Sequence, residues 1–93
     1  MIDPGRGIFA ISVAAELAGT TVQNLHAYER RGLLKPARTN GGTRRYSQDD
    51  VNRLVDIRDM LDSGLNTAGI ARVITLQAEV ARLQAEVDRL RQP

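Results

Sequence analysis

Few residues in this chain could carry out acid–base or metal chemistry. His26 is the only histidine, and the absence of cysteine excludes disulfides, thiolate metal sites and thiol catalysis. Five aspartates lie between positions 49 and 62, where the start and the solvated face of a helix account for them. The sequence contains no phosphate-loop, zinc or nucleophile-elbow motif. We therefore expect a protein that is not an enzyme and that uses no cofactor or metal.

A second group of side chains has the chemistry of nucleic-acid recognition. Gln23, Asn24 and His26 lie close together, and Gln or Asn can bind the adenine edge with two hydrogen bonds. Arginines follow, and their guanidinium groups suit DNA phosphates: Arg30, Arg31, Arg38, Arg44 and Arg45. On an isolated helix the polar residues would be ordinary surface residues. Together with the arginines, they predict contact with double-stranded DNA.

Charge is divided unevenly along the chain. Residues 1–47 hold seven basic and three acidic residues, a surplus of four positive charges, whereas residues 48–93 hold six basic and eight acidic ones, a surplus of two negative charges. This division is typical of a polyanion-binding half joined to a solvated, partner-forming half, although chance clustering gives the same pattern. Residues 1–7 lack the apolar centre of a secretory signal, and no apolar run reaches membrane-spanning length. We expect a cytoplasmic protein associated with the nucleoid and not with a membrane.

Two short predicted helices would position the recognition residues. Ser12 is the expected N-cap of a helix over residues 13–18, which Gly19 ends. Thr21 is the expected N-cap of a second helix over residues 22–31, which Gly32 ends. Two short helices joined around a glycine are typical of a helix-turn-helix, whose second helix enters the major groove.

A hairpin is predicted after a buried Leu33-Leu34 tether. Short polar arms flank Asn40-Gly41-Gly42, a strong turn sequence, and they would carry Arg38, Arg44 and Arg45 as a wing. Side chains alternate along a strand, so Arg44 and Arg45 cannot both face the same way. We expect that one of them can instead pair with an acid within the domain.

Two further helices complete the predicted fold, which is mostly α. Ser47 and Asp50 resemble a capping box that opens a helix ending at Ser63-Gly64. Asn66 or Thr67 would cap a last helix over residues 67–91. We expect a winged helix-turn-helix with a small β-hairpin wing and a long C-terminal helix.

The last helix carries an apolar seam with alternating spacings of three and four residues: Val73, Leu76, Val80, Leu83, Val87 and Leu90. Valine at a and leucine at d favour a two-stranded coiled coil, so the seam predicts a homodimer. The alternative is that the helix packs on its own domain. A seam of about two and a half heptads is marginal alone, so the dimer would need further contacts with the globular part.

The sequence resembles the MerR family of regulators. The segments that carry the resemblance cover about residues 8–75 and are Ile11–Ala14, Tyr28-Glu29-Arg30-Arg31-Gly32-Leu33-Leu34-Lys35-Pro36-Ala37-Arg38, Arg44-Arg45-Tyr46-Ser47 and Asp50-Val51. Within that family, Ile11–Gly19, Arg38-Thr39 before Gly41-Gly42, and Asn66 with Ala68-Gly69-Ile70 are most similar to the heat-shock repressor (HspR) branch.

This resemblance implies a homodimeric transcriptional regulator that binds and bends an inverted repeat in a promoter. It divides the chain into an N-terminal arm over residues 1–10, a MerR-type winged helix-turn-helix domain over residues 11–75 and a dimerisation helix over residues 67–91. The implied DNA contacts are Ser12, Thr21, Gln23, Asn24 and His26, the backbone-facing Tyr28 and Tyr46, and the wing arginines.

The resemblance also bears on partners and on helix direction. It implies that the dimer crosses its long helices antiparallel, whereas valine at a and leucine at d favour a parallel pair. The heat-shock branch implies a repressor with a chaperone as co-repressor. Two other functions stay open: a protein-interaction module whose basic half is incidental, and an architectural protein that binds DNA without selecting a sequence.

Overall fold

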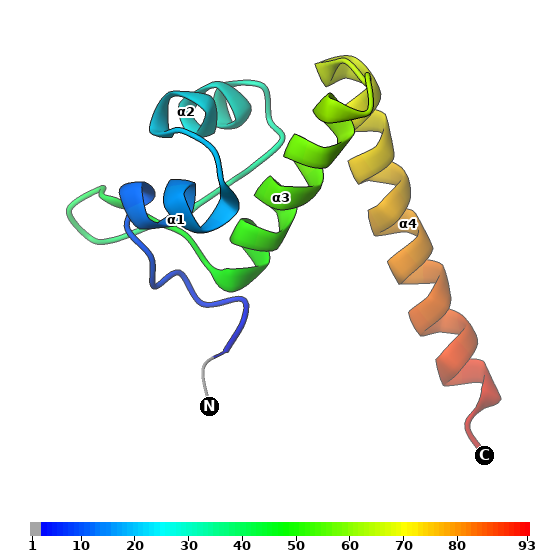
Figure 1. Ribbon diagram of the computed structural model, residues 1–93. Helices are drawn as coiled ribbons and strands as arrows, with labels where there is room; N and C mark the ends of the chain where they lie inside the picture. Colours follow the sequence, from blue (N-terminus) through cyan, green and yellow to red (C-terminus); the bar gives the residue numbers. More distant parts are fainter. Residues whose placement is uncertain (1–2) are drawn as a thin grey trace.

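Residues 3–93 are described by the computed structural model, which has six elements. In Figure 1 the helices of residues 11–62 are gathered in a globular part, and the last helix extends from it. In chain order the elements are α1 (Ile11–Ala18), α2 (Val22–Arg30), β1 (Ala37–Arg38), β2 (Arg44–Arg45), α3 (Gln48–Asp62) and α4 (Thr67–Arg91). The predicted fold class is confirmed: a mostly helical helix-turn-helix with a two-strand wing and a long C-terminal helix.

The ends of α1 and α2 form the turn of the helix-turn-helix. The prediction that Ser12 caps α1 is wrong, because the helix begins two residues earlier than predicted, its N-cap is Ala10 and no side chain caps it. Gly19 ends α1 in the left-handed conformation, at φ 70°. Thr21 caps α2 as predicted, since its hydroxyl accepts a hydrogen bond from the Asn24 amide.

The starts of α3 and α4 follow the capping predictions. At α3, Ser47 accepts from the Asp50 amide while the Asp50 carboxylate accepts from the Ser47 amide, which completes a capping box. At α4, the Asn66 side chain accepts a 2.8 Å hydrogen bond from the Gly69 amide. Both helices therefore begin at positions that their own local sequences specify.

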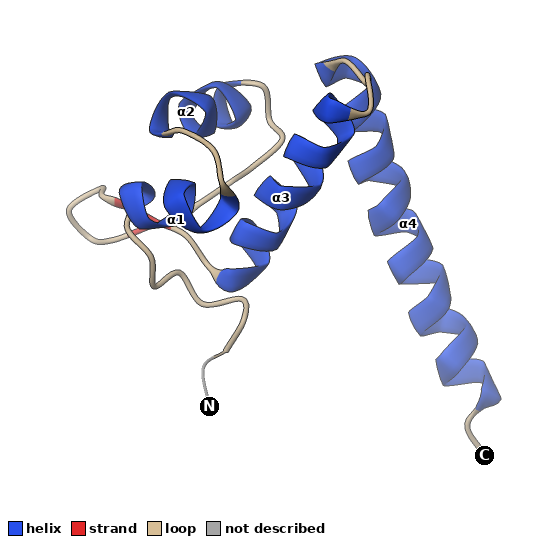
Figure 2. Ribbon diagram, in the orientation of Figure 1, coloured by secondary structure: helices blue, strands red, loops and turns tan. Residues whose placement is uncertain are grey.

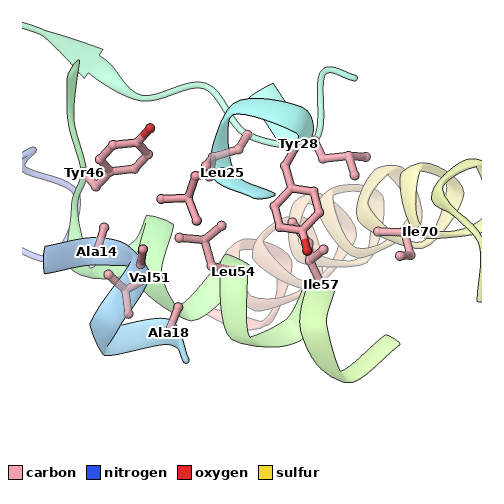
Figure 3. Packing of buried hydrophobic residues seen from close by; sticks show 12 residues of the cluster. Ala14, Ala18, Leu25, Tyr28, Tyr46, Val51, Leu54, Ile57 and Ile70 are labelled. Carbon is pink, nitrogen blue, oxygen red and sulfur yellow. The ribbon is translucent and has the colours of Figure 1, made fainter. Parts of the chain in front are cut away.

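The core lies between α1, α2, α3 and the first turn of α4. In Figure 3 the Tyr46 ring lies above Ala14 and beside Leu25. Tyr28 and Tyr46, for which DNA backbone contacts are predicted, both belong to this core. The buried hydrophobic residues are Ala14, Ala15, Ala18, Leu25, Tyr28, Leu33, Leu34, Tyr46, Val51, Leu54, Ile57 and Ile70.

The wing is a two-stranded antiparallel sheet, drawn in red in Figure 2. Its register pairs Ala37 with Arg45 and Arg38 with Arg44. The predicted N-terminal arm is attached to this sheet, because Phe9 and Tyr46 exchange backbone hydrogen bonds of 2.8 Å. The first two residues of the predicted arm lie outside the described part of the chain.

Helix α4 leaves the globular part after its first turns. Ile70 is fully buried against the core, and Ile74 is partly buried. Farther along, the predicted seam residues Leu76, Val80 and Leu90 are 62%, 64% and 69% exposed. The globular part of the same chain therefore leaves these seam residues exposed. Across residues 3–93, no helix is long and apolar enough to cross a membrane.

Candidate nucleic-acid interface

Helix α2 presents polar side chains on the face opposite the core. Leu25 and Tyr28, three residues apart, are buried and fix which way the helix faces. Gln23 and Asn24 are exposed, and His26 is half-buried. The Asn24 amide group donates a 3.0 Å hydrogen bond to the Thr20 hydroxyl, which holds it near the turn. Two amide side chains are thus available on the helix that the sequence assigns to the major groove.

The wing is fastened to the end of α2 by one carboxylate. Arg44 Nε donates a 2.6 Å hydrogen bond to Glu29 Oε1, and Arg38 Nη2 donates one of 3.1 Å to Glu29 Oε2. Arg44 is therefore the arginine of its strand that pairs with an acid. Glu29 was not predicted as this partner, although it is an acid only 9 and 15 positions from the two arginines.

The other arginines of this surface are held differently. Within residues 3–93, Arg30, Arg31 and Arg45 form no ion pair with an acid. Arg30 is exposed, and Arg31 donates a 2.7 Å hydrogen bond to the Thr67 hydroxyl at the start of α4. Arg45 is half-buried, and within the described residues its guanidinium group donates one hydrogen bond, of 3.4 Å, to the carbonyl of the neighbouring Arg44. Their positive charge is available to an anion such as a phosphate.

Two of the predicted contacts are hydroxyl groups near helix starts. Ser12 is exposed in the first turn of α1, and Thr21 is exposed at the N-cap of α2. Free backbone amides at helix N-termini attract phosphate oxygens, so both positions suit the DNA backbone. The structure places them on the two helices of the same motif.

Tyr46 lies beneath the wing with its hydroxyl buried. Among the described residues, that hydroxyl has no hydrogen-bond partner. Burial raises the pKa of Tyr46 above its usual value of 10.0, and the Glu29 carboxylate raises it further. The Tyr46 hydroxyl is therefore a neutral, enclosed group in this structure, and Tyr28 is also buried.

The apolar seam of α4 forms a separate surface. Val73 is partly buried, whereas Leu83 and Val87 are exposed like the other seam residues. Ion pairs within the helix, Arg82 with Glu79 and Arg89 with Glu86, accompany the seam. An exposed leucine and valine row on one helix is typical of a helix-pairing surface.

The described residues offer little to metal chemistry. Across residues 3–93, no three His, Asp or Glu side chains are grouped so that they could hold a metal ion. The candidate interface carries amides, hydroxyls and guanidinium groups. These are the groups that bind base edges and phosphates.

A helix-turn-helix with an arginine-bearing wing defines a class of DNA-binding proteins. The family of MerR HTH regulatory proteins matches residues 9–77. The chain belongs to the MerR family, so it is a DNA-binding transcriptional regulator and not an enzyme.

Individual relatives agree with this assignment. The chain is 45% identical over 84 residues to the heat shock protein HspR of Streptomyces coelicolor, a match that covers 89% of this chain and 56% of HspR. It therefore spans little more than half the length of that relative.

Solved structures share the fold. The lead-bound regulator PbrR691 of Ralstonia metallidurans matches with a TM-score of 0.72 and 25% identity, over 90% of this chain and 78% of PbrR691. HiNmlR, a MerR family regulator solved bound to promoter DNA, matches with a TM-score of 0.65 and 19% identity, over 88% of this chain and 74% of HiNmlR.

Proposed function

We propose that this protein binds an inverted repeat in promoter DNA as a homodimer and represses transcription. The observation that carries the proposal is the placement of exposed Gln23 and Asn24 on α2, beside a wing that α2 itself fastens through Glu29. Such a helix can enter the major groove while the wing lies along the flanking backbone. Repression is proposed from the similarity to the HspR branch.

Residue roles follow from exposure and chemistry. Gln23 and Asn24 would read base edges, with His26 beside them, because amides can bond adenine in a bidentate way. Arg45 and Arg30 would bind phosphates, and Ser12 and Thr21 would meet phosphates from their helix starts. Tyr28 and Tyr46 are left out of the direct contacts because both side chains are buried.

The homodimer is proposed to form along the α4 seam. Antiparallel pairing that sets Val73 against Leu90 also sets Leu76 against Val87 and Val80 against Leu83. All six seam residues of each chain are then used in one register. A two-fold axis through this pairing would present two identical DNA-binding domains to the two halves of an inverted repeat. A chaperone co-repressor is proposed from the HspR resemblance alone.

Selection of bound sites from random duplex DNA tests the proposed function. We expect recovered sequences to contain an inverted repeat whose half-sites are one or more helical turns apart. Recovery of duplexes without a shared sequence would favour an architectural protein. If the protein retained no duplex in low salt, the result would contradict the regulator proposal and would favour the protein-interaction module.

Cysteine crosslinking tests the direction of helix pairing. In the antiparallel register, a chain with Val73→Cys should form a disulfide with a chain carrying Leu90→Cys. Leu90→Cys alone should crosslink poorly, because the two copies of position 90 then lie at opposite ends of the pair. Efficient disulfide formation by Leu90→Cys alone would support a parallel dimer.

A further inference from the structure

One carboxylate holds both strands of the wing. Glu29 lies in the last turn of α2, and its two oxygens accept from Arg38 at 3.1 Å and from Arg44 at 2.6 Å. These arginines are directly paired across the sheet, so both side chains extend from the same face of the wing. A single residue of the recognition helix therefore contacts each strand once.

Few other contacts set the orientation of the wing. Each strand is two residues long, and a two-stranded hairpin is marginally stable in water. Arg38 adds a second bond, because its Nη1 donates to the Gly42 carbonyl at 3.1 Å. The Arg38 guanidinium thus joins the turn of the wing to Glu29.

The contact is partly sheltered from water. The Glu29 side chain is 21% exposed, and that of Arg44 is 33% exposed. The buried Tyr46 follows Arg45 directly and anchors the end of β2 in the core. The carboxylate and the tyrosine therefore fix the wing from its two ends.

We propose that Glu29 is a positioning residue that sets the wing relative to the recognition helix. Arg38 and Arg44 then act through Glu29 and not as phosphate ligands, which leaves Arg45 as the wing residue that meets the backbone. This inference rests on the proposed function. The opposing arrangement is one in which Glu29 neutralises two phosphate ligands that DNA must first displace from it.

The two arrangements predict opposite effects of Glu29→Gln on DNA affinity. The matched control is Glu16→Gln, an exposed glutamate of α1 that forms no ion pair within residues 3–93, since it changes the net charge equally. The probes are a duplex recovered by the selection and a scrambled duplex of the same length. Both are titrated over a range of salt concentrations.

If Glu29 positions the wing, Glu29→Gln binds the recovered duplex about threefold or more weakly than Glu16→Gln does. The slope of log affinity against log salt stays the same for the two variants. The inference is overturned if Glu29→Gln instead binds both duplexes more tightly, with a slope steeper by about 0.9 for each released arginine. Identical binding by the two variants overturns it as well.

A double-mutant cycle asks whether Arg44 acts through Glu29. We expect the loss of affinity in Glu29→Gln with Arg44→Gln to be smaller than the sum of the two single losses, because the Glu29–Arg44 contact can be broken only once. Additive losses would show that Arg44 contacts DNA independently and would overturn the inference. Arg45→Gln serves as the comparison, because its loss should add to that of Glu29→Gln.

Amide hydrogen exchange gives a readout that needs no DNA. The Gly42 and Thr39 amides donate within the wing, to the Thr39 and Thr43 carbonyls. These amides should exchange faster in Glu29→Gln than in Glu16→Gln. The exchange rates of the α3 amides should be the same in both variants. Equal exchange would overturn the positioning role. If the wild type retains no duplex, the proposed function fails, yet this exchange measurement still decides what Glu29 does.

A variant that unfolds would blur these measurements, so Arg38→Gln provides a second route. It removes the longer of the two arginine contacts of Glu29, and the Arg38 side chain is 46% exposed. We expect the same direction of change in wing exchange, with a smaller loss of binding. Wing exchange equal to that of Glu16→Gln would again overturn the inference.

Discussion

Arg58 Nη1 donates a 2.9 Å hydrogen bond to the carbonyl oxygen of Ala18. This bond joins the middle of α3 to the last turn of α1, where carbonyl groups lack partners within the helix. Gly19 follows directly, and its left-handed conformation turns the chain toward α2. One guanidinium group thus adds a polar contact to the apolar packing of the helix-turn-helix on α3.

Arg58→Ala should lower the free energy of unfolding by about 1–2 kcal/mol, because a hydrogen bond from a charged donor to a helix end is lost. Denaturant unfolding measures the change. Arg53→Ala is the control, since Arg53 lies on the same helix and makes no side-chain hydrogen bond within residues 3–93. Equal losses in the two variants would contradict a specific role for Arg58.

Gly19→Ala should be more destabilising than Gly32→Ala. Both glycines have positive φ, at 70° and 75°, so each alanine carries a conformational cost of about 1 kcal/mol. At Gly19 a Cβ would also lie 2.5 Å from Arg58 Nη1, whereas at Gly32 it meets nothing within 4 Å. Thermal unfolding of both variants checks this order, and combining Gly19→Ala with Arg58→Ala should remove the difference. If Gly32→Ala lost as much stability as Gly19→Ala, the result would contradict a clash between a Cβ at position 19 and Arg58.

Tyr46→Phe should leave stability at neutral pH unchanged or slightly raised, because the hydroxyl is buried without a partner. The wild type should lose stability as the pH rises above 10.0, since the unfolded chain releases the Tyr46 proton more readily than the folded one. The variant should lose less over that range. Unfolding curves between pH 8 and about pH 11 make the comparison.

DNA affinity of the same variant tests the predicted backbone contact of Tyr46. A hydroxyl that stays buried predicts unchanged binding to the recovered duplex. A tenfold loss would restore Tyr46 to the interface and would require the side chain to move on binding.

Arg45→Ala should weaken binding to recovered and scrambled duplexes alike. The loss of one phosphate contact lowers the slope of log affinity against log salt by about 0.9. Fluorescence anisotropy across salt concentrations measures both quantities. Arg72→Ala, an exposed arginine on α4, is the charge-matched control. A slope equal to that of the control would remove Arg45 from the phosphate contacts.

Asn24→Ala should reduce sequence preference at one position of each half-site. Loss of a bidentate contact to a base costs about 1–3 kcal/mol of discrimination. Selection repeated with the variant should yield the same repeat with one degenerate position. An unchanged sequence pattern would exclude Asn24 from direct reading and would assign its amide to the Thr20 contact.

Local sequence patterns predicted most of this fold. Thr21, Ser47 and Asn66 cap their helices through side chains that contact residues three positions away, and such contacts can be read from the chain. Ser12 was misassigned because α1 starts without any side-chain cap. A serine near a helix start is a preference and does not fix the boundary.

The parts that sequence could not supply are contacts between distant residues. Glu29 meets Arg44 across 15 positions, and Arg58 meets Ala18 across 40. The burial of Tyr46 depends on the packing of separate helices, which a wing motif alone does not reveal. Residue type identified the arginines, but only the fold separates the two that Glu29 holds from Arg45.

The exposed seam of α4 has a consequence for gene dosage. If two chains must meet along this seam before both half-sites are filled, promoter occupancy at low expression depends on the square of the protein concentration. A twofold change in synthesis would then change occupancy about fourfold in that range, by mass action. Such a promoter would respond steeply to the abundance of its own regulator.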